Sequence, residues 1–279
     1  MTAAEFTLVV WVISAVAGFL GALTGLGGGV IVVPALTLAL GVDIKYAIGA
    51  SLVSVIATSS GAAAAYVKEG FSNIRIGMLL EIATTIGAVL GAYLAGYTST
   101  HVLAIVFGLV LVQSAWQTVF NAPRESGQPI ESDALALRLR LAGDYPVEGK
   151  RVEYGVRNVP AGFGIMFGAG ALSGLLGIGS GAVKVIAMDQ AMKVPFKVST
   201  TTSNFMIGVT AAASAGVYLS RGYIHPSVAM PVMLGVLGGA LVGTKVLVHA
   251  RVKTLRLVFA VVIFALAIEM IVNGLMKRI

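Results

Sequence analysis

The chain contains no cysteine and has unusually few charged residues. Without cysteine, disulfide bonds, thiolate metal sites and thiol chemistry are all excluded. Charged residues make up 11% of the sequence, whereas a soluble domain carries about 25%, so this chain could not cover its own surface in water. Its three histidines, His101, His225 and His249, lie far apart at the ends of apolar segments. We therefore expect no metal site and no cofactor.

What the sequence does have is a series of long apolar stretches. Most are near or above the roughly 18 residues that a helix needs to cross a bilayer. They cover residues 6–24, 26–42, 47–67, 76–97, 102–120, 160–176, 178–192, 198–219, 226–248 and 254–275. The sequence thus predicts an all-α polytopic membrane protein, with membrane lipid as its surroundings.

The formal net charge of +7 would indicate nucleic acid as a partner in a soluble domain. In a membrane protein, basic loops that face the cytoplasm are the simpler explanation, and we expect no nucleic-acid binding. Ala15 and Ala17 could mimic a signal cleavage site. However, no Lys or Arg precedes the first apolar stretch and that stretch continues past the site. We expect this segment to stay in the membrane.

The chain is a duplicated unit. The glycine cluster at 25–29 returns at 177–181, an offset of 152 residues. At the same offset many further positions are identical: Lys45/Lys197, Ser51/Ser203, Thr58/Thr210, Tyr66/Tyr218, Gly70/Gly222, Gly87/Gly239 and Gly91/Gly243. This repeat predicts a first transmembrane unit at 1–120 and a second at 159–279, joined by a cytoplasmic linker at 121–158.

The direction of each unit depends on what the glycine cluster does. If it only interrupts one spanning helix, the loop Lys and Arg residues divide 11 inside to 7 outside, with Lys184 left out. If it reverses the chain into a hairpin, the division becomes 14 to 4. The second arrangement obeys the positive-inside tendency better, so we predict two inverted repeats.

The linker 121–158 is the one soluble stretch, with six basic and six acidic residues. Apolar residues alternate from Leu135 to Leu141, and Val152 to Val156 follow after a turn. This pattern predicts a small β-hairpin. A connecting role is favoured over a regulatory or partner-binding one.

The glycine clusters themselves are candidates for a binding site. Their spacing excludes a dinucleotide fingerprint, because Val30 occupies the place of the third glycine. In a bilayer, broken helices survive where they are buried or line a wet cavity, and paired breaks in two repeats indicate a central site. The amides near Val30 and Ala182 would suit an anion. The alternative is close helix packing, which we favour for the pairs Gly87/Gly91 and Gly239/Gly243.

A second candidate is the polar run 199–204, Ser-Thr-Thr-Thr-Ser-Asn. On a helix, Thr201 and Asn204 share one side with Thr200 and Ser203 beside them, so hydroxyl and amide donors could face an oxyanion. The counterpart in the first repeat is less continuous and consists of Ser51, Ser54, Thr58, Ser59 and Ser60. Hydroxyls also bond back to their own helix, and we favour that role for Ser54 and Ser60.

Lys184 lies three residues beyond the second glycine cluster, where the first repeat has Val32. A lysine inside a membrane segment costs at least about 2.5 kcal/mol and is a functional candidate by default. Snorkelling and an ion pair with Asp189 are the alternatives. Glu81 and Glu269 lie near the ends of their stretches, and we expect both to be structural.

The candidate substrate-binding residues therefore come from both breaks, the polar run and its counterpart. They are Gly27, Gly28, Gly29, Ser51, Thr58, Gly179, Ser180, Gly181, Lys184, Thr200, Thr201, Ser203 and Asn204. An intramembrane serine protease built on Ser180 is disfavoured, because no histidine sits within a segment. We expect no catalytic residues.

The glycine motifs at 21–34 and 173–181, each followed by an AIGASL or STTTSN segment, resemble the sulfite exporter TauE/SafE family, also called the four-toluene-sulfonate uptake permease family. The resemblance covers residues 10–275 apart from the linker. It implies inner-membrane transport of small sulfur-containing anions such as sulfite or organosulfonates. A transporter of other small organic anions, an anion channel and a homodimer stay open.

Overall fold

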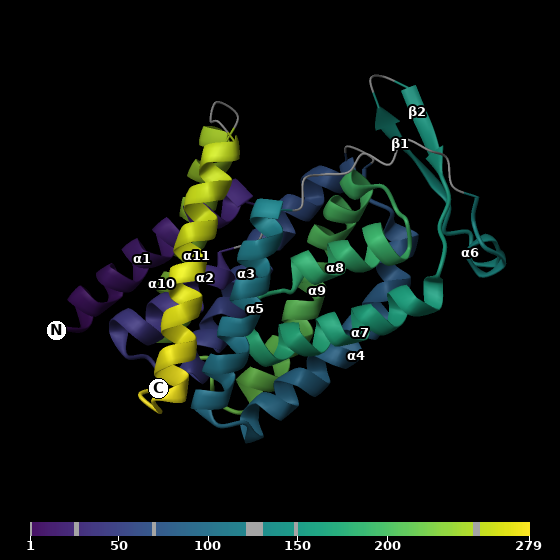
Figure 1. Cartoon of the computed structure of the whole chain (residues 1–279). Coiled ribbons are helices and arrows are strands. Elements are labelled where there is room, and N and C mark those ends of the chain that lie inside the picture. The colour runs from purple at the N-terminus through teal and green to yellow at the C-terminus, as the bar shows by residue number, and fades with distance from the viewer. Residues whose placement is uncertain (1, 25–27, 69–70, 121–130, 148–149, 248–251) are drawn as a thin grey trace.

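The computed structural model describes residues 2–24, 28–68, 71–120, 131–147, 150–247 and 252–279. Helices form nearly all of this structure, and two short strands protrude at one end (Figure 1). The elements are α1 (Ala3–Thr24), α2 (Gly29–Pro34), η1 (Ala35–Ala39), α3 (Ile44–Lys68), α4 (Ile74–Tyr97), α5 (Thr100–Phe120), α6 (Ala134–Arg138), β1 (Gly143–Val147), β2 (Lys150–Tyr154), α7 (Val159–Leu176), α8 (Gly181–Ile186), η2 (Ala187–Ala191), α9 (Phe196–Ser220), α10 (Pro226–Leu247) and α11 (Val252–Leu275).

The two units have the same order of elements at the sequence offset of 152 residues. In each, a long helix is followed by a six-residue α-helix that continues into one turn of π-helix, α2–η1 in the first unit and α8–η2 in the second. Each of these half-helices ends before a residue with positive φ, Gly41 at 64° and Lys193 at 59°. The duplication predicted from the sequence is therefore visible in local structure.

Packing between helices also repeats. α1 lies along α10 and α4 lies along α7, whereas α5 pairs with α11 and α3 with α9. A side chain at Gly239 would collide with the Ala15 carbonyl, and one at Gly87 would collide with the equivalent Phe167 carbonyl. These glycines let two helix backbones approach closely, which confirms their predicted packing role.

Along the described chain, five helices are long and apolar enough to cross a membrane, namely α1, α4, α5, α7 and α10. α4 illustrates how such a helix divides its surface. Leu80, Ala83 and Ala88 are buried, whereas Met78 and Ile82 are exposed. Apolar side chains cost nothing when they face lipid, because the lipid tails are equally apolar. The structure is thus that of an all-α, multi-pass membrane protein.

The linker contains the predicted β-hairpin. Its second strand overlaps the predicted stretch 152–156, whereas its first strand lies after the predicted stretch 135–141. β1 and β2 pair antiparallel, with Gly143 opposite Tyr154 and Val147 opposite Lys150. The alternating stretch from Leu135 belongs to helix α6 instead. Asp133 caps this helix by accepting a hydrogen bond from the amide of Ala136 at 2.8 Å. A favourable N-cap followed by leucine and alanine outweighs the alternation.

The hairpin is attached to the helical bundle through Tyr154. Its hydroxyl accepts a hydrogen bond from Nδ2 of Asn73, at 2.7 Å. The same Nδ2 donates to the carbonyl of Leu141, and the Asn73 backbone amide donates to Oγ1 of Thr202 in α9. Burial raises the pKa of Tyr154 to about 12. Asn73 therefore joins the linker, the start of α4 and α9.

Candidate functional site

The two glycine breaks meet beside Ser51 of α3. The Ser51 hydroxyl donates a hydrogen bond to the carbonyl of Gly177 in the second break, at 2.8 Å. A side chain on Gly29, at the end of the first break, would collide with the same hydroxyl and approach the same carbonyl. The contact therefore requires glycine at position 29, and it brings together two segments that are far apart in the sequence.

The second break contains three residues in left-handed backbone conformations. Gly177 has φ 69°, Gly179 has φ 71° and Ser180 has φ 44°. Two of these positions suit glycine because a left-handed residue with a Cβ is strained. Ser180 is the exception. Its Oγ is buried and has no hydrogen-bond partner among the described residues, which is uncommon for a polar atom.

The first break is less regular where it can be described. Gly27 lies outside the described residues. Gly28 has an ordinary helical φ of −67°, and a side chain there would collide with Val236. Gly28 is thus required by close packing against α10, not by a special conformation.

Lys184 projects from α8 into the protein interior. Its side chain is 0% exposed, and Nζ donates a hydrogen bond to Oγ1 of Thr210 at 2.6 Å. Thr210 lies on α9, and within the described residues it is the hydrogen-bond partner of this amine. An ammonium has three hydrogens to donate. Snorkelling to the membrane surface, one of the alternatives for Lys184, does not occur in this structure.

Glu81 of α4 completes this cluster. Oγ1 of Thr210 lies 2.7 Å from Oε1 of Glu81, so the hydroxyl stands between the amine and the carboxyl group. Oγ1 of Thr85 also donates to Oε1, at 3.2 Å. Oε2 is buried and lacks a hydrogen-bond partner in the described part of the chain. One buried polar cluster therefore has members from three helices. α4 belongs to the first unit, and α8 and α9 belong to the second.

The predicted hydroxyl residues divide into two groups. Ser203 lies at the second break, where its Oγ donates to the carbonyl of Gly181 at 3.3 Å. In contrast, Thr200 donates to the carbonyl of Phe196 within its own helix. Thr201 donates to the carbonyl of Phe71 in the loop before α4, and Asn204 is half-buried.

Thr58, in the first repeat, donates to the carbonyls of Ser54 and Val55 in its own helix. Ser54 and Ser60 also bond to carbonyls of α3, as expected for them. The residues that the structure brings together are therefore Gly29, Ser51 and Gly177 at the crossing, Ser180, Gly181 and Ser203 at the second break, and Lys184 with Thr210 and Glu81.

Sequence reasoning missed Glu81 and Thr210 as members of the site. The signal was present, because Glu81 has the uncharged Met233 as its counterpart in the second repeat, just as Lys184 has Val32 in the first. At the offset of 152 residues, the trio Glu81, Thr210 and Lys184 corresponds to Met233, Thr58 and Val32. The hydroxyl is retained in both trios, and both charges are confined to one.

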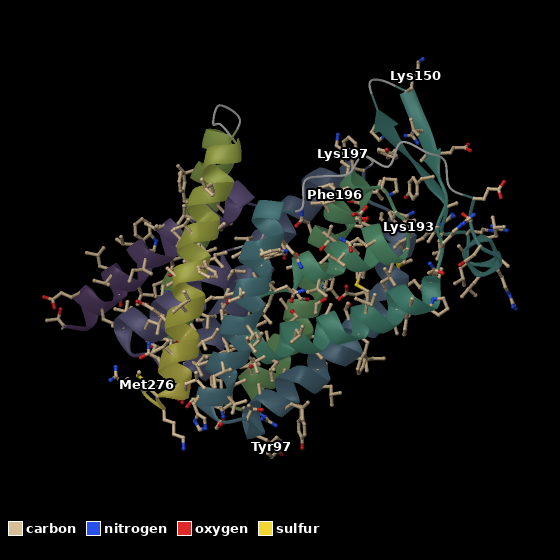
Figure 2. The ribbon with its side chains drawn as sticks, in the orientation of Figure 1. Tyr97, Lys150, Lys193, Phe196, Lys197 and Met276 are labelled. Carbon is tan, nitrogen blue, oxygen red and sulfur yellow. The ribbon has the colours of Figure 1, made fainter. Side chains whose placement is uncertain are left out.

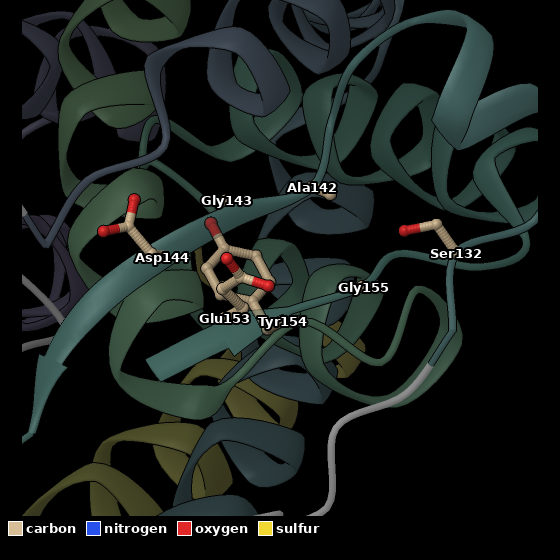
Figure 3. Close-up of a pocket in the computed structure, with 7 residues that line it drawn as sticks. All are labelled: Ser132, Ala142, Gly143, Asp144, Glu153, Tyr154 and Gly155. Atoms are coloured by element: carbon tan, nitrogen blue, oxygen red, sulfur yellow. The ribbon is translucent and has the colours of Figure 1, made fainter. Parts of the chain in front are cut away.

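Two clefts elsewhere are poorly suited to an anion. One, of about 470 Å³, lies beside the hairpin and is lined by Asp144 and Glu153 among others (Figure 3). Its carboxylates would repel an anion. The other lies between α1 and α10 and is lined mainly by apolar side chains such as Trp11 and Leu234.

The family profile described as sulfite exporter TauE/SafE matches residues 10–270 of this sequence. The chain belongs to the TauE/SafE sulfite exporter family. This TauE/SafE protein is 26% identical over 271 residues to the probable membrane transporter protein YunE of Bacillus subtilis (strain 168), covering 95% of this chain and 97% of the relative. It is also 26% identical over 240 residues to the probable membrane transporter protein YdhB of the same strain, covering 85% and 87%.

A probable membrane transporter protein of Haemophilus influenzae is 25% identical over 206 residues, covering 73% of this chain and 69% of the relative. No solved structure matches the chain. The family, the relatives and the apolar helices together identify the TauE/SafE protein as a multi-pass membrane transporter.

Proposed function

We propose that this TauE/SafE protein is a secondary transporter of small sulfur-containing anions such as sulfite or organosulfonates. It moves them across the cell (inner) membrane by alternating access around the two broken helices. The family description names sulfite exporters, and the names of the relatives specify only membrane transporters. Other small organic anions are the alternative substrates, and an anion channel is the alternative mechanism. The relatives' names favour a transporter over an enzyme.

The observation that carries this proposal is the fully buried amine of Lys184. A cation in the membrane interior is costly, and Glu81 reaches this one only through the Thr210 hydroxyl. Its direct partner is the neutral hydroxyl of Thr210, so hydrogen-bonding capacity remains for a bound anion. The unpartnered Ser180 hydroxyl lies one helical turn earlier, at the start of α8, and supports the same location.

The two repeats are inverted in this proposal. The support comes from one contact that occurs twice. Lys45 Nζ lies 5.6 Å from the ring centroid of Tyr223. Lys197 is the repeat counterpart of Lys45, and its Nζ lies 4.1 Å from the ring centroid of Phe71, the counterpart of Tyr223. Lys45 also donates to the carbonyl of Gly96, beside Tyr97. Figure 2 shows Tyr97 at the end of the bundle opposite Lys197 and the hairpin residue Lys150.

Inverted repeats give a route to alternating access. α3 and α9 contact each other, and each donates a hydrogen bond to the second break, α3 through Ser51 and α9 through Ser203. Rocking of the α1–α10 pair against the α4–α7 pair would open the two ends in turn, while the substrate stays near Lys184.

A thermal-shift screen tests the function. The purified protein is heated with sulfite, sulfoacetate, taurine, thiosulfate, sulfate, lactate or acetate. A bound ligand raises the melting temperature, because it binds the folded state alone. We expect stabilisation by sulfite or a sulfonate in the wild type and a clearly smaller shift in Lys184→Met at the same anion concentration. Stabilisation by lactate or acetate alone would favour the organic-anion alternative, and no shift with any anion would contradict the proposal.

Uptake into proteoliposomes separates a transporter from a channel. A transporter that alternates access has a limited turnover, so the initial rate should saturate as the anion concentration rises. A rate that keeps rising in proportion to concentration would identify a channel.

A further inference from the structure

One oxygen of the Glu81 carboxyl group has hydrogen-bond partners, and the other has none among the described residues. Oε1 lies within hydrogen-bond distance of two hydroxyls, those of Thr210 and Thr85. Oε2 is buried without a partner in the described structure. The two hydroxyls both donate to Oε1, so Oε2 is the oxygen that stays open to a proton. The geometry thus singles out Oε2 as the atom that would carry a proton.

The charged surroundings of Glu81 are simple. α7 and α9 are the helices that pack most extensively against α4. α7 carries no titratable side chain. On α9, Lys197 lies against Phe71 and the hydroxyl of Tyr218 bonds to the Leu175 carbonyl, both away from this cluster. Lys184 of α8 is the charged group that acts on Glu81.

An empty site and an occupied site differ in their charge balance. In the empty site, one ammonium and one carboxylate compensate each other across the Thr210 hydroxyl. An anion that binds to Lys184 places a second negative charge near the same cation. Charges interact strongly in a buried site, because the effective dielectric constant is far below that of water. The arrangement of two anions around one cation therefore favours protonation of Glu81.

We propose that Glu81 takes up one proton when an anion binds at Lys184, so that the protein moves the anion together with a proton. This inference rests on the proposed function. The proton comes from a hydronium ion or a buffer acid in the bulk solution. Its bond to that donor breaks as an O–H bond forms on Oε2, and the donor stays in solution as water or the conjugate base. Release of the anion restores the attraction of Lys184 for the carboxylate, and the proton leaves Glu81 again. Lys184 then binds the substrate, and Glu81 couples its movement to protons.

Isothermal titration calorimetry of the purified, detergent-solubilised protein tests this coupling. The probe is sulfoacetate, whose sulfonate and carboxylate are both ionised between about pH 6 and about pH 8. Titrations in buffers with different ionisation enthalpies report how many protons the complex takes up. We expect about one proton per bound sulfoacetate, with affinity that falls about tenfold for each unit of rising pH.

Glu81→Gln should bind sulfoacetate without proton uptake and with an affinity that does not change with pH. Glu269→Gln is the matched control, because it removes a carboxylate from the exposed side of α11 and should behave like the wild type. Glu81→Asp keeps an ionisable group, so it should keep the proton uptake even if affinity changes. It serves as the second variant if Glu81→Gln does not fold.

The outcomes separate the two proposals. If wild-type protein binds sulfoacetate without taking up protons, or if Glu81→Gln takes up as many as the wild type, the coupling role of Glu81 is wrong and the transport function stands. If neither sulfoacetate nor any other anion of the thermal-shift screen binds, the proposed function is wrong, and the coupling role is wrong with it.

Discussion

Lys184 and Glu81 come from different halves of the chain, and the hydroxyl of Thr210 joins them. The amine lies 2.6 Å and the carboxyl oxygen 2.7 Å from the same Oγ1. One neutral group thus holds a cation and an acid in place without direct contact between them. Each of the three side chains therefore has a different expected effect when it is changed.

Lys184→Met should weaken anion binding far more than it weakens the fold. Loss of a charge-assisted hydrogen bond lowers affinity by roughly 1.5–3 kcal/mol, or about ten- to a hundredfold. The fold loses little, because Glu81 can become neutral once the cation is gone. Lys184→Arg should restore only part of the affinity, since guanidinium is larger and planar. Sulfoacetate titration and melting temperatures measure both effects, and unchanged affinity in Lys184→Met would contradict the anion site.

Thr210→Val should destabilise the protein by about 1–3 kcal/mol, because it removes the hydroxyl between two buried polar groups. Thr58→Val is the matched control. Thr58 is the repeat counterpart, and among the described residues its hydroxyl bonds to carbonyls of its own helix, so its loss should cost less. Denaturant unfolding of the two variants gives the comparison. Equal losses would mean that the Thr210 bridge contributes nothing of its own.

Gly177→Ala should be destabilising because this residue has φ 69°. A left-handed residue with a Cβ costs about 1–2 kcal/mol, and the added methyl would also collide with Ile48. Gly164→Ala is the control, since it lies within α7 with open space around it. That change should stabilise the helix by up to about 1 kcal/mol. Thermal unfolding should move the two variants in opposite directions.

Cysteines introduced at positions 45 and 193 should react with a membrane-impermeant reagent from opposite sides of the membrane. The natural chain has no cysteine, so each variant carries a single thiol. We expect position 45 to label from outside, and position 193 to label from the cytoplasm, on the side of the linker. Labelling of both from the same side would show that the repeats are parallel.

Tyr154 should titrate later than an exposed tyrosine. Its pKa is raised to about 12 by burial, above the usual value of about 10. Because the folded-state pKa is the higher one, the stabilisation by Tyr154 is complete below about pH 10 and is lost as the pH rises through about 12. Phenolate absorbance should show this late step in the wild type and not in Tyr154→Phe. Attachment of the hairpin to Asn73 should weaken over the same range.

The sequence predicted features that depend on local pattern or on the repeat. The paired half-helices after the glycine clusters, and the packing role of Gly87 and Gly239, follow from residue type and spacing alone. The first strand of the hairpin was misplaced, because the alternating residues from Leu135 form a capped helix and not a strand. Local pattern was insufficient there.

Glu81 shows a different limit. Its position near the start of an apolar stretch indicated contact with water, yet it is 8% exposed. The burial arises because α7 and α9 cover this part of α4, and nothing in the neighbouring sequence records which helices do so. Thr210 was inconspicuous for the same reason. A threonine in a membrane helix is ordinary until Lys184 and Glu81 are placed on either side of it.

The repeat positions that correspond to Lys184 and Glu81 hold Val32 and Met233. This difference affects how many anions one chain can bind. The duplication gives two equivalent trios of positions, but only the trio Glu81, Thr210 and Lys184 carries charges. The other trio, Val32, Thr58 and Met233, carries no charge, so these positions offer no countercharge for a second ion. Equilibrium dialysis should therefore saturate at one anion per chain. In the proposed mechanism, the second unit would bind the anion through Lys184 and the first would supply the acid Glu81, a difference in roles that two identical copies could not provide.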